Sequence, residues 1–263
     1  NLQSGQSADA GRYYAGMFDD PALKGLATMG ARPLLRGWLS RDPGAAGRIA
    51  LLVPPDALPA GGFTVMPSVH AAGYVAHDRL PDPMALYAEC EAAWAELKLP
   101  ALEGLSVGDT GWFQSMFIVR WVSRQANDLG FYLEQSGQAD RAAEAYRKAI
   151  EFWPDNVSAA LNLREQARRE NDKDAEEQWS AVLAQMAERN PGAFSVAYLI
   201  QYCGSVRDPA ALIAEASSLI KAGGDDAALN RITQAAGLMG DKGEDQQYSL
   251  AQFHLQNRDY AEA

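Results

Sequence analysis

The feature that most constrains the fold is a series of small and turn-forming residues at fixed spacing within residues 123–156. Gly130 and Ala142 are small at positions where two neighbouring helices would have to approach each other closely. Gly137 suits the left-handed backbone geometry that often ends a helix, and Pro154 cannot continue one. The spacing therefore predicts two helices joined by a short turn, with a second turn after them.

The same segment resembles a tetratricopeptide repeat, a helix–turn–helix unit of roughly 34 residues. The resemblance rests on Ala126-Asn127-Asp128-Leu129-Gly130, Gly137, Ala142, Tyr146, Ala149 and Pro154-Asp155-Asn156. Tyr146 shares a helix face with Ile150, because the two lie about one turn apart. Ala126 departs from the family pattern, which often has tryptophan there. The resemblance implies a mainly α fold, an α-solenoid of helical hairpins over about residues 123–263.

A second, degenerate copy follows directly. Val157 begins its first helix, and Arg164 stands where the first unit has a small residue. Another helix is predicted over residues 174–189, where apolar side chains recur every three and four positions. Asn190-Pro191 then repeats the ending of the first unit.

Three more helices are predicted over residues 194–202, 209–220 and 226–239, with Gly204 as a break after the first of them. Residues 248–263 match the first half of one further unit. Half a unit cannot bury its own apolar face. We therefore expect the sequence to be a fragment, truncated at the C-terminal end of its repeats.

The first third of the chain does not repeat. Its pattern predicts a helix or helix pair over 21–40, short strands over 49–53 and 62–66, a third strand or loop at 74–75, and a helix over 82–97. The predicted organisation is thus a small α/β segment over residues 1–110 and helical repeats over 111–263. The α/β segment is expected either to cap the repeats or to be the tail of an upstream domain.

Composition narrows the classes of partner. Hydrophobic residues make up 48% and charged residues 22% of the 263 residues, which argues against wholesale disorder. A net charge of −11 repels phosphate backbones, so nucleic acid is not expected as a partner. No apolar run reaches the ~18 residues of a membrane helix. Cys90 and Cys203 lie far apart without a Cys/His cluster, so a zinc site is not expected. We expect two buried free thiols, with one long-range disulfide as the alternative. No cofactor is expected.

In tetratricopeptide arrays the first helices of successive units line a concave groove, and the resemblance implies the same role for matching residues here. They are Arg124, Asn127, Phe131, Glu134, Asn162, Glu165 and Arg168. Some members of the family clamp a peptide's terminal carboxylate with lysine, arginine and asparagine. This chain departs from that pattern, since Asn127 and Phe131 stand where lysine and asparagine would be needed. The implied partner is a protein or peptide segment.

For two other groups of residues, the sequence leaves two possible roles open. His70 and His77 lie near Asp78, which would suit a hydrolytic site only with a third convergent group. Trp112, Phe113, Phe117 and Trp121 run along one predicted helix before the first repeat. These aromatic residues either pack into the core or form part of an exposed partner surface.

The leading functional prediction is a non-catalytic protein–protein interaction scaffold. The alternative rests on domain order, since short α/β segments followed by tetratricopeptide repeats resemble the soluble region of bacterial membrane-embedded glycosyltransferase-like proteins. In that case this chain would be an accessory, extracytoplasmic part of a membrane-bound transferase, associated with an upstream membrane region. Any catalysis would then be carried by that upstream part.

Overall fold

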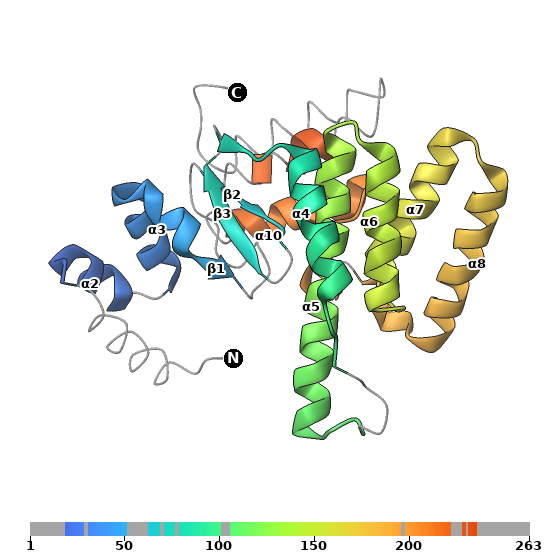
Figure 1. Cartoon of the computed structure of the whole chain (residues 1–263), viewed down its shortest axis with the longest axis horizontal. Helices are drawn as coiled ribbons and strands as arrows, with labels where there is room; N and C mark the ends of the chain where they lie inside the picture. Colours follow the sequence, from blue (N-terminus) through green and yellow to red (C-terminus); the bar gives the residue numbers. More distant parts are fainter. Residues whose placement is uncertain are drawn as a thin grey trace.

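The computed structural model describes residues 19–28, 31–51, 63–68, 71–76, 79–100, 106–195, 198–221, 228–229 and 231–235. Over these residues the chain is mainly helical, with a small sheet near its beginning (Figure 1). The prediction of a mainly α class is thereby confirmed. Within the same ranges, no helix combines the length and the apolar character that a membrane span requires.

The α/β segment follows the predicted order. It contains α2 (Pro21–Thr28), α3 (Ala31–Arg41), η1 (Pro43–Arg48), β1 (Ala50–Leu51), β2 (Phe63–Met66) and β3 (Ala72–Ala76). The strands form an antiparallel sheet in the order β1-β3-β2, with Leu51 opposite Ala72 and Val65 opposite Tyr74. Buried residues of the sheet and of α3 pack around Trp121, which belongs to a later helix. The sheet is therefore attached to the helical part by a shared core.

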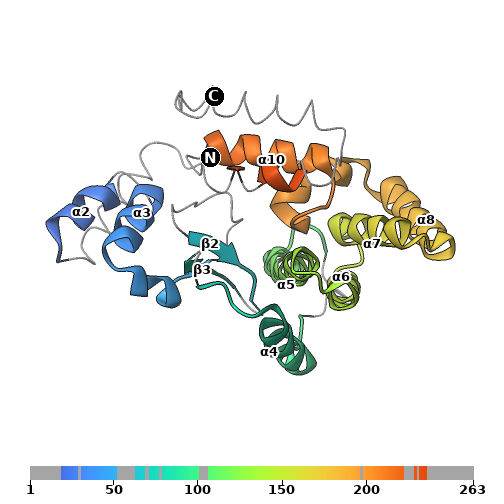
Figure 2. The same cartoon turned by 90° about the horizontal axis from the view of Figure 1, so that it is seen from above.

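A helix close to the predicted bounds connects the sheet to the helical hairpins. It is α4 (Pro83–Glu96), and the Asp82 side chain caps its start by accepting a 2.8 Å hydrogen bond from the Ala85 amide. Leu86, Tyr87, Cys90 and Trp94 recur every three or four residues and are buried against the two following helices. This helix covers one side of the repeat region (Figure 2).

Two successive helical hairpins follow, the first near the centre of the molecule and the second at its right-hand end in Figures 1 and 2. They are α5 (Thr110–Gln135) with α6 (Ala139–Phe152), and α7 (Val157–Glu170) with α8 (Lys173–Arg189). Gly137 has a positive φ of 78° in the first turn, as its position predicts, and Asn171 has a φ of 57° in the second. The aromatic residues were expected on a helix before the first predicted unit. That helix is continuous with the first helix of the unit, because α5 runs unbroken from Thr110 onward.

Gly130 permits the close contact of α5 with α6. A Cβ atom at this position would lie 2.6 Å from the Tyr146 ring and 3.1 Å from the Ala142 carbonyl oxygen. The prediction that two small residues mark a close helix approach is confirmed, since Ala142 and Tyr146 are fully buried there.

Replacing Gly130 with alanine should lower the free energy of unfolding by about 1–2 kcal/mol. Overpacking a core costs about 1–3 kcal/mol, and the better helix propensity of alanine offsets up to about 1 kcal/mol of it. Urea denaturation would measure the change, with Gly25→Ala in α2 as the control because a Cβ there meets no atom within 4 Å. A Gly130→Ala variant as stable as the wild type would contradict the close contact.

The third predicted unit differs from the first two. The helix expected over residues 194–202 is replaced by the short 3₁₀-helix η4 (Pro191–Phe194) and the π-helix η5 (Leu199–Cys203). Gly204 then reverses the chain with a φ of 91°, and α10 (Pro209–Lys221) follows as expected. Residues 231–235 are helical, while residues 236–263, which include the further half unit predicted over 248–263, lie outside the described residues.

Candidate functional site

Residues 199–207 of the chain itself lie across the face where the sequence implies a groove. Arg124, Asn127 and Asn162 are all less than 5% exposed and contact this segment. The segment contains η5 and the extended stretch before α10. The expected groove is therefore occupied by an internal segment, which we call the docked segment.

Of the other four implied groove residues, two are buried and two lie at the surface. Phe131 is buried against Leu212 of α10 and Ala235, and Glu134 is buried between helices. Glu165 is half-buried and Arg168 is exposed, and the two form an ion pair at 2.8 Å. The structure thus brings five of the seven residues to the core of the molecule and leaves two at its surface.

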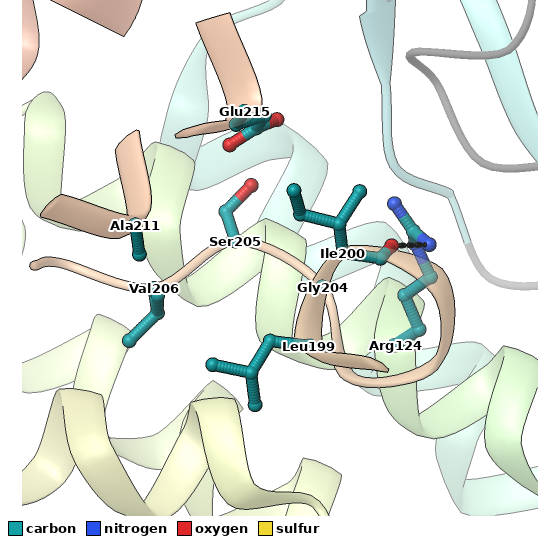
Figure 3. A pocket seen from close by; sticks show the side chains of 8 residues that line it. All are labelled: Arg124, Leu199, Ile200, Gly204, Ser205, Val206, Ala211 and Glu215. Atoms are coloured by element: carbon teal, nitrogen blue, oxygen red, sulfur yellow. Dashed lines mark hydrogen bonds between the residues drawn. The ribbon is translucent and has the colours of Figure 1, made fainter. Parts of the chain in front are cut away.

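Arg124 holds the first turn of the docked segment. Its Nη1 donates to the main-chain oxygen of Ile200, as Figure 3 shows, and to that of Gln201 at 3.0 Å. Its Nε forms an ion pair with Asp128 at 3.3 Å, one turn further along α5. Because the guanidinium serves two carbonyl oxygens and a carboxylate, its charge is neutralised despite burial.

Asn127 and Asp128 hold the next part of the segment by its main chain. The Asn127 amide donates to the Ser205 oxygen at 2.8 Å, and the Asp128 carboxylate accepts from the Ser205 amide at 2.7 Å. Both polar groups of one peptide residue are thereby satisfied by neighbouring residues of α5. An asparagine–aspartate pair of this kind fixes the direction of the bound chain, because one side chain donates and the other accepts.

Side chains of α7 complete the contact from the other hairpin. Asn156 donates to the Cys203 oxygen at 3.2 Å, and the Ser158 hydroxyl donates to the Gly204 oxygen at 2.9 Å. Asn162 donates to the Ser205 oxygen at 3.0 Å and accepts from the Arg207 amide at 2.7 Å. Together with Arg124, Asn127 and Asp128, these residues bind main-chain atoms of the segment.

Gly204 fits a space that no other residue can enter. Its φ of 91° and ψ of −168° lie in a region that is essentially restricted to glycine. A Cβ atom there would lie 2.7 Å from the Asn127 amide nitrogen and would also overlap the Asp128 carboxylate. The residue is thus required both by backbone conformation and by the lack of space.

A buried charge cluster anchors the far end of the segment. Glu134 forms an ion pair with Arg207 at 3.0 Å and another with Arg169 of α7, and it accepts a 2.8 Å hydrogen bond from the Tyr146 hydroxyl. The Glu134 side chain is only 3% exposed. Burial, with the nearby Arg207 charge, lowers the pKa of Arg169. The cluster joins α5, α6, α7 and the docked segment through one carboxylate.

Aromatic rings hold the same segment from its other side. The Arg120 guanidinium lies 4.9 Å from the centre of the Trp153 ring and 5.1 Å from that of Tyr202. Tyr202 in turn packs against Tyr198 at 4.8 Å. Cation–π contacts at this range attach η5 to α5 and to the turn between α6 and α7.

The small cavity beneath the segment is too small for a ligand. Its volume is about 10 Å³, close to the space of one water molecule. Figure 3 shows the side chains around it, among them Arg124, Ser205 and Glu215. A larger open pocket of about 560 Å³ lies between η1 and the sheet, next to Phe63, Tyr74 and Arg79.

The cysteine prediction is confirmed for both residues. Cys90 and Cys203 are buried free thiols, and burial raises the pKa of each, to about 12 and about 11 respectively. Within the described ranges, no group of three or more His, Cys, Asp or Glu side chains could hold a metal ion. His70, His77, Asp78 and His254 lie outside the described residues.

Of the aromatic residues of α5, some pack into the core and others are exposed. Trp121 is buried in the core of the sheet, whereas Phe113 and Phe117 are 58% and 52% exposed. The first part of α5 extends beyond the rest of the described chain (Figure 1). Ile118 and Val107 are also exposed there, so the start of α5 presents apolar side chains to its surroundings.

Sequence reasoning missed four residues of the site, namely Ser123, Asp128, Asn156 and Ser158. Asn156 was read as part of a turn, yet its side chain caps α7 at Ala159 and also binds the docked segment. Ser123 supports it by accepting a 2.8 Å hydrogen bond from the Asn156 amide. The one sequence signal that pointed to these residues was a polar residue at regular spacing within an otherwise apolar helix face.

Comparison of the chain with protein-family models, curated proteins and solved structures finds no match.

Proposed function

We propose that this chain is a non-catalytic interaction module of the tetratricopeptide type, which holds a polypeptide segment by its main chain. The groove lies between the first helices of two successive hairpins, α5 and α7. The observation that supports it is the set of hydrogen bonds from Arg124, Asn127 and Asn162 to main-chain atoms of residues 200–207. These three residues were assigned to a peptide groove from the sequence alone.

The chemistry of the groove suits peptide recognition. Each asparagine side chain offers an NH2 group that donates and an oxygen that accepts, which can match the carbonyl and the amide of a bound chain. Such main-chain contacts give affinity for many sequences, while pockets for individual side chains give specificity. An external partner would use the same contacts as the docked segment.

A peptide-display selection tests this proposal. Random 12-residue peptides would be selected against the full chain carrying Gly204→Ala, whose docked segment is expected to be loosened by the added Cβ atom. We expect enriched peptides that bind this variant with micromolar affinity.

The matched control adds Asn162→Ala to the same variant. Loss of its two main-chain hydrogen bonds, each worth about 0.5–1.5 kcal/mol, should weaken the selected peptides about tenfold or more. If the selected peptides bind both variants equally, or if none is enriched, the groove is not a peptide site.

A further inference from the structure

The docked segment has a pattern of side chains that matches separate places along the groove. Leu199, Cys203 and Val206 are at most 5% exposed and pack into one apolar cluster with residues of α7 and α8. Arg207 reaches the Glu134 carboxylate. Gln201 is exposed, and its main-chain oxygen accepts from Arg124.

Two positions of the docked segment strongly restrict which residue can occupy them. The position of Gly204 excludes any side chain, for reasons of both conformation and space. The position of Arg207 offers a buried carboxylate, which favours a cation and disfavours an acidic residue. Main-chain contacts therefore hold the segment, and these two positions would select it from others.

We propose that the external partner of the groove is a peptide carrying the same pattern as residues 199–207, which forms a helical turn followed by an extended stretch. This pattern is an aliphatic residue, any two residues, an aromatic residue, a small residue, glycine, any residue, an aliphatic residue and arginine. The inference rests on the proposed function and names the class of peptide that the groove takes. The docked segment is then a built-in competitor that keeps the groove filled until such a partner replaces it.

The tether sets the conditions for this exchange. A segment joined to its own groove acts at an effective concentration on the order of mM for a short linker. A free peptide with the same contacts would have to exceed that concentration to displace it from the wild-type chain. Weakening the docked segment lowers the peptide concentration needed for exchange without changing the residues of the groove. Peptide binding to the filled groove and to the vacated groove can therefore be compared in chains that differ at one residue.

The test uses a labelled synthetic peptide with the sequence of residues 198–208, under reducing conditions. We expect it to bind the Gly204→Ala chain at least tenfold more tightly than the wild-type chain. The Gly192→Ala chain is the matched control, because a Cβ atom at that exposed glycine makes only an ordinary contact, 3.5 Å from Asn190. It should behave as the wild type does.

Two altered peptides test the pattern itself. Versions carrying Gly204→Ala or Arg207→Glu should each bind the Gly204→Ala chain at least tenfold more weakly than the original peptide. If all three peptides bind alike, the pattern is wrong. If peptides from the display selection bind but the 198–208 peptide does not, the docked segment is no mimic of the partner, although the groove remains a peptide site.

A second variant covers the case in which Gly204→Ala prevents folding, which circular dichroism would detect. The Arg207→Glu chain places a carboxylate beside Glu134 and loosens the segment by charge repulsion instead of overlap. The unaltered peptide should bind this chain more tightly than the wild type. Equal binding to both chains would overturn the proposal.

Discussion

Replacing Glu134 with alanine should lower the free energy of unfolding by about 1–3 kcal/mol, because the buried Tyr146 hydroxyl loses its acceptor while the two arginines that lose their partner are partly exposed. The substitution removes the partner of Arg169 and Arg207 and the acceptor of the Tyr146 hydroxyl in one step. Urea denaturation followed by circular dichroism would measure the loss. Since one carboxylate joins three helices and the docked segment, we expect a lower midpoint for the whole transition.

Glu165→Ala provides the control for that measurement. Glu165 pairs with two arginines of α7, but Arg168 is 65% exposed and Arg169 is 37% exposed and 4.0 Å away, and such surface pairs contribute about 0–1 kcal/mol. The difference between the two variants should therefore be several-fold. A Glu134→Ala chain no less stable than the Glu165→Ala chain would show that the buried cluster does not hold the hairpins together.

Gly204→Ala should destabilise the docked segment by about 2–4 kcal/mol while leaving the hairpins folded. Backbone strain of this kind costs about 1–3 kcal/mol, and the overlap with Asn127 and Asp128 adds to it. Hydrogen exchange would locate the change. The amides of Ser205 and Arg207, which donate to Asp128 and Asn162, should exchange faster than in the wild type.

Protection of the amides within α5 to α8 is the internal reference for that experiment. These helices keep their own hydrogen bonds and their core around Leu129 and Tyr146, so their exchange should change little. Uniformly faster exchange across the chain would mean that the segment and the hairpins open together. Unchanged exchange at Ser205 and Arg207 would mean that Gly204 is not needed for docking.

Elements with a local cause were predictable from the sequence. The close approach at Gly130 and Ala142, the turn at Gly137 and the start of α4 after Asp82 each depend on residues within one helical turn or one hairpin. Two of the three strands were also predicted, because short apolar runs there are bounded by turn residues, whereas residues 74–75 were expected as either a strand or a loop. Such features need no knowledge of distant parts of the chain.

The docked segment was not predictable in the same way. The hydrogen bonds from Arg124 and Asn127 join residues separated by 76–78 positions. Apolar spacing favoured a regular helix over residues 194–202, but side chains of α5 and α7 bind the carbonyl oxygens of Ile200, Gln201 and Cys203. Gly204 was recognised as a break, and its fit against Asn127 and Asp128 appears only in three dimensions.

The position of the docked segment in the chain also sets the order in which the site is made. Both helices that bind it are complete by Glu170, and the segment follows only about thirty residues later. At synthesis rates of about 5–20 residues per second, the segment leaves the ribosome roughly 2–6 s after α7. Each new molecule therefore passes through an interval in which its groove has been synthesised and its own competitor has not.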